Sequence, residues 1–150
     1  MPQVRRANQA DLAAATDLFA EYFAAIELPA ELRDDAETIA EYLDDPRALF
    51  LAYDGGALAG TIALRPLDGR DAACEIKRLY VRPKHRRRGL AEALLDALEN
   101  HARERGFRTA YLDTRPDMEA ALAFYLRRGY ERCEPYNDNP VAAHFLRRRL

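Results

Sequence analysis

The chain has 150 residues, 49% hydrophobic and 32% charged, which predicts one globular domain spanning residues 1–150 with a buried core. A net charge of −2 argues against a generally basic nucleic-acid-binding protein. Cys74 and Cys133 lack metal-ligand spacing, no signal peptide is recognisable, and no apolar run is long enough to span a bilayer. We therefore expect a cytoplasmic protein with no bound metal, no nucleic-acid partner and no membrane partner.

The first half of the chain predicts two helices followed by an antiparallel meander. Apolar residues recur at helical or alternating spacing, and Pro29 and Pro46 limit the helices. Asp54-Gly55-Gly56 favours a hairpin turn because these residues tolerate a positive φ. The expected elements are a strand at 3–7, a helix from Asn8 or Asp11 to about Ile26, a helix at 34–43, and strands at 48–53, 58–65 and 73–81.

The second half predicts alternating helices and strands. The expected elements are a helix at 89–105, a strand at 107–114, a helix at 117–128, and strands at 130–135 and 142–149. The order strand, helix, strand across residues 75–114 implies a parallel strand pair with a right-handed crossover. We therefore expect an α/β fold whose mixed, mostly antiparallel sheet has six to seven strands and about four flanking helices.

The segment at 75–91 carries the strongest chemical signal in the chain. A strand is expected to end before Pro83, and a basic turn then leads into a helix at Gly89. The free N–H groups of that helix and the positive end of its dipole face back toward the turn. With the consecutive arginines at 86–88, this arrangement predicts a site for a phosphate or pyrophosphate.

Three phosphate-binding patterns compete for this turn. A P-loop requires Gly-Lys-Ser/Thr, and the dinucleotide fingerprint requires three spaced glycines, whereas the turn contains only Gly89. The pattern Arg/Gln-x-x-Gly-x-Gly/Ala is met by Arg86, Gly89 and Ala91. Small residues at these positions let the backbone approach an anion, and Arg87 and Arg88 add charge. A solvated surface and a DNA contact are the alternatives, and acidic residues nearly everywhere else argue against DNA.

Two segments resemble the motifs of one enzyme family. Residues 75–95 resemble the core motif of the GNAT superfamily of acetyl-CoA-dependent N-acyltransferases, and residues 121–130 (Ala-Leu-Ala-Phe-Tyr-Leu-Arg-Arg-Gly-Tyr) resemble its second motif. The resemblance extends across the chain, apart from Met118, where many members carry asparagine. It implies that acetyl-CoA is the cosubstrate and lies in a V between the strand at 73–81 and the strand near Leu112. The implied cofactor-binding residues are Leu79, Tyr80, Val81, Arg86, Arg87, Arg88, Gly89, Leu90 and Ala91.

The same resemblance implies how these residues are used. Backbone groups of Leu79 and Val81 would pair with the pantetheine arm, and residues 86–91 would hold the pyrophosphate. The backbone N–H of Leu79 or a neighbour would bind the oxyanion. A bulge often separates the two strands in this family, but nothing in the sequence marks one here.

Tyr125 and Glu75 are the candidate catalytic residues. Tyr125 matches the family's usual proton donor, and hydrogen-bond donation to the thiolate is the expected role because a phenol (pKa about 10) is a weaker acid than a thiol (about 8.5). A core aromatic is the alternative. Glu75 matches the glutamate base of the histone-acetylating branch, and strand alternation places it on the face of Lys77, Leu79 and Val81 unless a bulge intervenes. A structural Glu75–Lys77 ion pair is the alternative.

The acceptor is indicated only by charge. Seven acidic residues crowd the region of the second helix, namely Glu31, Asp34, Asp35, Glu37, Glu41, Asp44 and Asp45. They form either a solvated face or a rim that attracts a cationic amine.

Three functions remain open at this point. They are N-acetyl transfer to a small amine by direct attack in a ternary complex, acetylation of a protein lysine or N-terminus, and non-catalytic binding of acetyl-CoA or nucleic acid. Tyr125 favours an enzyme over a binding module. Homodimers are common among the proteins that this chain resembles, so a homodimer is one expected assembly.

Overall fold

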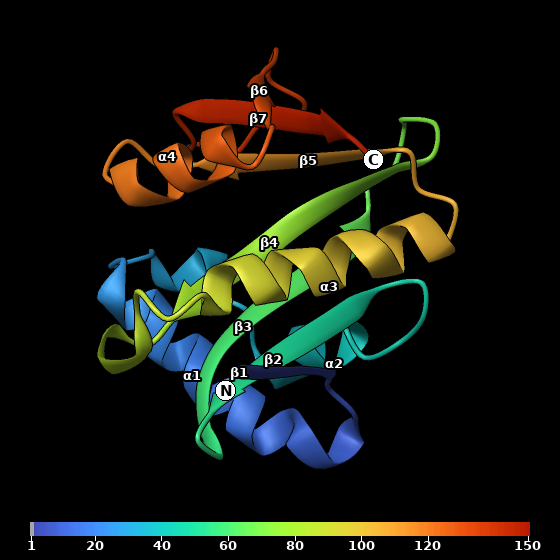
Figure 1. Cartoon of the computed structure of the whole chain (residues 1–150). Helices are drawn as coiled ribbons and strands as arrows, with labels where there is room; N and C mark the ends of the chain where they lie inside the picture. Colours follow the sequence, from blue (N-terminus) through green and yellow to red (C-terminus); the bar gives the residue numbers. More distant parts are fainter. Residues whose placement is uncertain (1) are drawn as a thin grey trace.

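The computed structural model describes residues 2–150 and contains one mixed sheet with helices on both faces (Figure 1). The seven strands are β1 (Pro2–Arg6), β2 (Ala48–Asp54), β3 (Ala57–Pro66), β4 (Ala73–Val81), β5 (Thr109–Thr114), β6 (Glu131–Arg132) and β7 (His144–Arg149). Their order in the sheet is β1-β2-β3-β4-β5-β7-β6. Only β4 and β5 pair in parallel, and every other neighbouring pair is antiparallel. The expected mixed, mostly antiparallel sheet is confirmed.

Four helices cover the sheet. They are α1 (Leu12–Ala25), α2 (Ala36–Glu41), α3 (Leu90–Glu104) and α4 (Glu119–Arg127), with short 3-10 turns η1 (Gln9–Asp11), η2 (Ala30–Leu32) and η3 (Pro83–His85). Figure 1 shows α3 and α4 in front of the sheet and α1 and α2 behind it. No helix within residues 2–150 is both long and apolar enough to cross a membrane.

The two expected caps of the first helix act together in η1. The Asn8 side chain accepts a hydrogen bond from the Ala10 N–H, and the Asp11 carboxylate accepts one from the Asn8 N–H. This reciprocal capping satisfies N–H groups at the helix start, so α1 itself begins one residue after Asp11. The second helix is shorter than expected, because Asp35 caps it through the Thr38 N–H and it ends at Glu41.

The sheet divides the core into two layers. On the α1 and α2 side the largest fully buried side chains are those of Phe19, Phe23, Ile39, Leu49 and Leu51. On the α3 and α4 side they are Leu90, Leu94, Leu95, Leu98, Ile62 and Leu64. The apolar stripe expected on the helix at 89–105 therefore packs against the sheet, as its spacing predicts.

The last part of the chain differs from the sequence-based expectation. The expected strand at 130–135 is reduced to Glu131–Arg132, although the Cys133 N–H still donates to the Phe145 carbonyl. Pro135 has no N–H to continue the ladder. The chain then turns so that the Tyr136 ring packs on the Tyr111 ring, 5.3 Å away. β7 accordingly begins at His144 rather than at 142.

The two cysteines are expected to react at different rates with a thiol reagent. Cys74 is fully buried in the α3-side core, and burial raises its pKa to about 12. Cys133 is half-buried. Because the thiolate is the reactive form, native protein near pH 8 should react with Ellman's reagent at Cys133 alone, and both thiols should react in concentrated guanidinium chloride. Rapid reaction of a native Cys133→Ser variant would contradict the burial of Cys74.

Candidate active site

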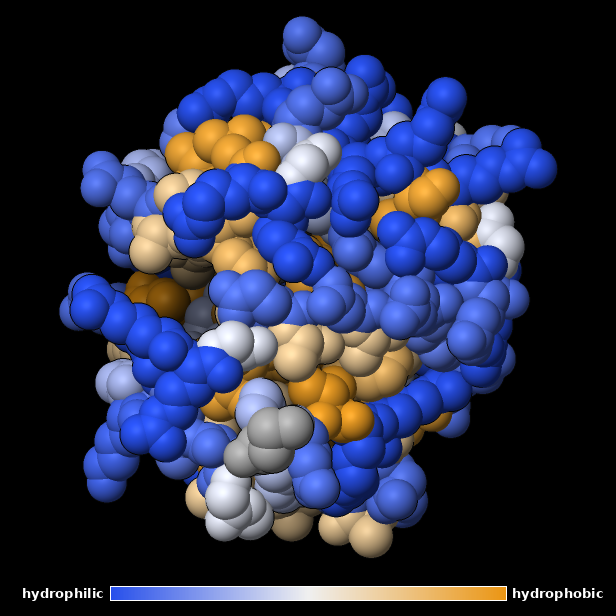
Figure 2. Space-filling model, viewed as in Figure 1, coloured by the Kyte–Doolittle hydropathy of each residue, from blue (hydrophilic) through white to orange (hydrophobic). Residues whose placement is uncertain are grey.

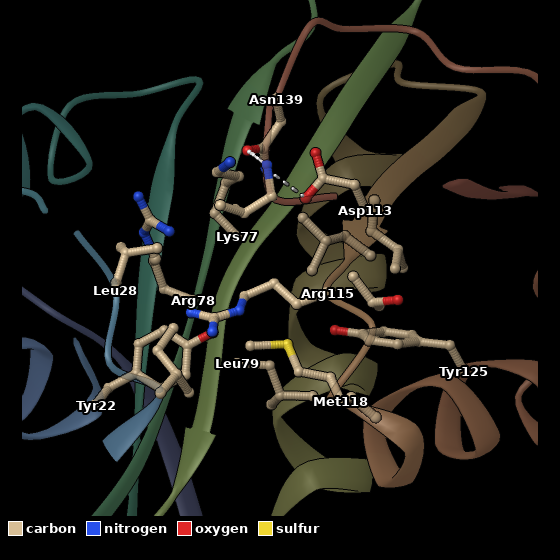
Figure 3. Close-up of a pocket in the computed structure, with 16 residues that line it drawn as sticks. Tyr22, Leu28, Lys77, Arg78, Leu79, Asp113, Arg115, Met118, Tyr125 and Asn139 are labelled. Carbon is tan, nitrogen blue, oxygen red and sulfur yellow. Dashed lines mark hydrogen bonds between the residues drawn. The ribbon is translucent and has the colours of Figure 1, made fainter. Parts of the chain in front are cut away.

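β4 and β5 pair only at their beginnings. The parallel ladder joins Ala73–Glu75 to Thr109–Tyr111 and goes no further. Beyond it a pocket opens between the two strands, lined by Ile76–Leu79 of β4 and Leu112–Thr114 of β5 (Figure 3). The V that the family resemblance implies is therefore present.

A bulge in β4 separates the two strands. Lys77 lies opposite Ala63 and Tyr80 lies opposite Thr61, so β4 uses three residue steps where β3 uses two. Arg78 takes up the extra residue with a φ of 61°. A bulge of this kind changes the face on which the following side chains lie.

The bulge decides on which face of β4 the residues after Arg78 lie, which the sequence left conditional on a bulge. Leu79 and Val81 pack against the α3-side core, which also contains Cys74. Strict alternation would place Leu79 and Val81 on the face of Glu75, which is opposite the face of Cys74. The extra residue in the bulge moves them to the face of Cys74. Glu75 therefore does not share a face with Leu79 and Val81.

The bulged strand presents free backbone groups to the pocket. The Arg82 N–H donates to the Ala59 carbonyl at 2.7 Å. In an antiparallel ladder the preceding residue, Val81, then directs its own N–H and C=O to the opposite edge. Consistent with this, the Val81 carbonyl accepts a hydrogen bond from the Arg86 side chain at 2.8 Å on that open edge. Leu79 occupies the previous position on the same edge.

The basic turn has the geometry of an anion site. Gly89 is the N-cap of α3, with a φ of 79° and no side-chain cap. Arg87 has a φ of 65°. Left-handed residues in a turn point successive N–H groups into one concavity, and the first N–H groups of α3, including that of Ala91, open toward it.

The side chains of the turn have different partners. Arg88 and the His85 ring both bind Asp54 of the β2–β3 turn, at 2.9 and 2.8 Å. The hydrogen bond from His85 lowers the pKa of Asp54. Arg86 is held by Val81, whereas Arg87 is exposed and makes no hydrogen bond or ion pair with any other residue of the described chain.

Two of the expected cofactor-binding residues point their side chains elsewhere. The Leu90 side chain is buried in the α3-side core, with an exposed fraction of 1%. The Tyr80 hydroxyl donates to Glu21 at 2.9 Å on the α1 side. Only the backbone groups of Tyr80 and Leu90 are therefore available to a ligand in the pocket or turn.

Tyr125 lies on α4 with its hydroxyl directed into the pocket (Figure 3). Its ring packs edge-on against Phe124 and Tyr130, each 5.3 Å away between centroids. The Tyr130 N–H also donates to the Tyr125 carbonyl, which fixes the end of the helix. Burial raises the pKa of Tyr125 well above its ordinary value. The phenol therefore stays protonated and can act as a hydrogen-bond donor.

Glu75 lies beneath the pocket in a polar network. It is 1% exposed and accepts hydrogen bonds from Arg65 at 2.8 Å and from Tyr136 at 2.8 Å. The Lys77 ammonium is 3.9 Å from the carboxylate and itself lines the pocket. Burial lowers the pKa of Lys77. The closest cationic partner of Glu75 is thus Arg65, which the sequence did not suggest.

The far side of the pocket comes from segments that are distant in sequence. Tyr22 and Leu28 approach from the end of α1, and Asn139 and Val141 approach from the β6–β7 loop. The family resemblance implies that the first two helices and the last loop border the acceptor, but it singled out none of these residues. The polar run at 137–140 marks the loop in the sequence. No local pattern relates that loop to α1.

The model of the acetyltransferase (GNAT) family matches residues 12–130. The chain belongs to this family. An uncharacterized N-acetyltransferase of Schizosaccharomyces pombe is 28% identical over 142 residues, covering 78% of this chain and 86% of that protein.

Solved structures show the same fold. A GNAT acetyltransferase of Staphylococcus aureus superposes with a TM-score of 0.84 at 21% identity, covering 99% of both chains. The PaiA N-acetyltransferase of Thermoplasma acidophilum, in complex with coenzyme A, superposes with a TM-score of 0.78 at 14% identity, covering 100% of this chain and 99% of that one. The GNAT fold of the chain is therefore shown.

Three of the seven acidic residues in the segment at 31–45 of this GNAT protein have partners within the fold. Asp34 binds Arg78 at 2.8 Å, Asp35 caps α2, and Asp45 binds Arg105 at 2.9 Å. The other four acidic residues are exposed to solvent, namely Glu31, Glu37, Glu41 and Asp44. Across residues 2–150 no group of three or more His, Cys, Asp or Glu side chains is arranged to hold a metal ion.

Proposed function

We propose that this protein transfers the acetyl group of acetyl-CoA to a primary amine of a small molecule, by direct attack in a ternary complex. One observation carries the proposal. The opening between β4 and β5 leaves an edge of β4 unpaired and contains the buried hydroxyl of Tyr125, and the uncapped start of α3 follows β4 in the chain. Coenzyme A bound by the PaiA protein, which has the same fold, supports acetyl-CoA as the cosubstrate.

The residues of the opening fit the parts of acetyl-CoA. Backbone groups of Leu79 and Val81 suit the amides of the pantetheine arm, with Arg86 released from the Val81 carbonyl or bound beside it. The N–H groups of residues 87–91 and the charges of Arg86, Arg87 and Arg88 suit the pyrophosphate. Tyr80 and Leu90 contribute backbone groups only.

The chemical step needs a neutral amine, an oxyanion donor and a donor to the leaving thiolate. The backbone N–H of Leu79 is the proposed oxyanion donor. Tyr125 is proposed to donate a hydrogen bond to the thiolate as the C–S bond breaks. Its raised pKa makes complete proton transfer to a thiolate (thiol pKa about 8.5) unfavourable, so hydrogen bonding is the role that the geometry supports.

Glu75 is proposed to accept the proton that the amine loses. Glu75 does not line the pocket, so the proton would travel through a bridging water or the neighbouring Lys77 amine. The purely structural role, an anion held by Arg65 and Lys77, is the competing proposal. A Glu75→Gln variant separates the two proposals. If Glu75 is a base, the variant should have a lower kcat, most of all at low pH. If Glu75 is only an ion-pair partner, the variant should lose stability and keep its kcat.

The cover over the pocket favours a small acceptor over a protein. Val141 of the β6–β7 loop packs against the hydrophobic cluster of α1 and α2, so the loop crosses the acceptor side. A protein substrate needs an open groove there. We also propose that residues 1–150 act as one catalytic domain, because the one sheet carries both halves of the site. A homodimer and a cytoplasmic location stay predictions from the sequence.

A panel of amines tests the proposal. Release of free coenzyme A thiol is followed with acetyl-CoA and amino acids, polyamines, amino sugars or short peptides. Turnover of at least one small amine and none of the peptides is expected. The proposal is wrong if no amine releases thiol, and calorimetric binding of acetyl-CoA without turnover would then indicate a binding module.

A further inference from the structure

The pocket between β4 and β5 has an excess of positive charge in its walls. Its charged lining residues are Lys77, Arg78, Arg115 and Asp113. The three basic side chains are only 14%, 16% and 19% exposed. Buried cations cost free energy unless negative groups offset them. Each of the three has one carboxylate within 4 Å, that of Glu75, Asp34 or Asp117. The thioester end of acetyl-CoA is uncharged and adds no negative group.

Arg115 is the cation whose pocket-facing side lacks a partner. Its Nε and Nη2 lie 3.2 and 3.4 Å from the Asp117 carboxylate at the exposed rim. Its Nη1 is buried and has no hydrogen-bond partner within the described chain. Figure 3 shows the side chain extending across the pocket toward Tyr22. Asp117 thus holds two of the three guanidinium nitrogens and leaves the third, Nη1, unpaired beside the pocket.

Arg78 is held in place beside the same pocket. Its Nε donates to Asp34 at 2.8 Å, and its guanidinium lies over the Phe23 ring, 5.0 Å from the centroid. Both contacts come from the α1 and α2 side, which is the side away from α3 and its anion-binding turn. Positive charge is therefore concentrated on the acceptor side of the pocket.

One carboxylate, that of Asp113, lines the same pocket from β5, two residues before Arg115. Asp113 accepts hydrogen bonds from Asn137 at 2.7 Å and from Asn139 at 3.4 Å. These amides are neutral, so Asp113 retains a charge that can attract an ammonium group. A pocket with a single acid and a surplus of bases matches a ligand that carries both an amine and an anion.

We propose that the acceptor amine carries an anionic group, a carboxylate or a phosphate, that binds the unpaired edge of Arg115 while the amine lies toward Asp113. This inference rests on the proposed function, because it names the acceptor class of the same site. A rim that attracts a cationic amine was one of two explanations for the acidic residues between 31 and 45, but within the described chain none of them lines the pocket.

Matched pairs of acceptors test the proposal. One pair is methionine and methioninamide, and the other is glucosamine 6-phosphate and glucosamine, so the two pairs distinguish carboxylate from phosphate. We expect the anionic member of at least one pair to have a KM at least about 10-fold lower, the range of a charge-assisted hydrogen bond. Arg115→Gln should remove that preference and leave the KM of acetyl-CoA unchanged.

Arg103→Gln is the matched control. Arg103 is an exposed arginine on α3 whose side chain donates to Asn100 at 3.3 Å and does not line the pocket, so its variant should keep the preference. A wild-type preference for the uncharged members or for polyamines would overturn the proposal. So would an Arg115→Gln variant whose KM rises for acetyl-CoA instead of the acceptor.

Calorimetry separates this inference from the proposed function. The anionic amines are titrated into protein saturated with coenzyme A, for the wild type and both arginine variants. If no amine releases thiol, the proposed function fails. Even so, binding that Arg115→Gln weakens about 10-fold and Arg103→Gln does not would support the anionic ligand. Absent binding, or equal binding by all three proteins, would refute it.

Discussion

Replacing Gly89 by aspartate is expected to weaken the binding of coenzyme A by at least about 100-fold. Two like charges about 4 Å apart near a protein surface repel by about 4 kcal/mol, and each 1.4 kcal/mol is a factor of ten in affinity. The new side chain has room, because the nearest atom to its Cβ is a Glu92 oxygen at 3.8 Å. The fold should therefore survive, with a strain of about 1–2 kcal/mol from the left-handed backbone. Calorimetric titration with coenzyme A measures the effect.

Gly106→Asp is the control for this variant. Gly106 follows the other end of α3 and has a φ of 83°, so it carries the same backbone strain and the same new charge away from the proposed site. Its coenzyme A affinity should remain that of the wild type. A Gly89→Ala variant separates strain from charge and should bind with intermediate affinity. Unchanged affinity in Gly89→Asp would remove the turn at 86–91 from the proposed cofactor site.

Replacing Tyr125 by phenylalanine is expected to lower kcat by about 100-fold, the lower part of the range for a positioned proton or hydrogen-bond donor. The Tyr125 hydroxyl has no hydrogen-bond partner within residues 2–150, and its ring keeps its packing against Phe124 and Tyr130. Folding stability and the affinity for coenzyme A should therefore change little. Steady-state kinetics of thiol release, with thermal unfolding beside it, measures both quantities.

Tyr130→Phe provides a control with the same chemical change. The Tyr130 hydroxyl donates to buried Glu99 at 2.8 Å. Removing it should lower the free energy of unfolding by about 1–3 kcal/mol, because it leaves a buried charge with one donor fewer. Its kcat should stay near that of the wild type. The reverse pattern, with full activity in Tyr125→Phe, would show that Tyr125 is a core aromatic only.

Local rules account for the elements that the sequence predicts well. The strand at 73–81 has the expected bounds, and the expected helix at 89–105 forms as Leu90–Glu104 with Gly89 as its cap. Alternating or helical apolar spacing and a glycine boundary are properties of adjacent residues, so they can be read without the fold. The same holds for the order of the two motifs, which points to the GNAT family before any contact is known.

Long-range contacts decide what the sequence leaves open. The bulge at Arg78 requires a positive φ at a residue that does not favour it, and Asp34 and Phe23 hold its side chain there. That bulge reverses the faces of Leu79 and Val81 and so separates them from Glu75. No local pattern in β4 signals it, because its cause lies in α1 and in the segment before α2.

The sequence alone therefore determined the family motifs, the basic turn and the position of Tyr125, since each depends on neighbouring residues. The tertiary structure decided which charges face the acceptor. Arg115, Asp113 and Tyr22 meet only because β5 and α1 border the same opening. The acidic residues most visible in the sequence turn to solvent, to a helix cap or to arginines, because folding pairs charges according to distance in space and not according to their order in the chain.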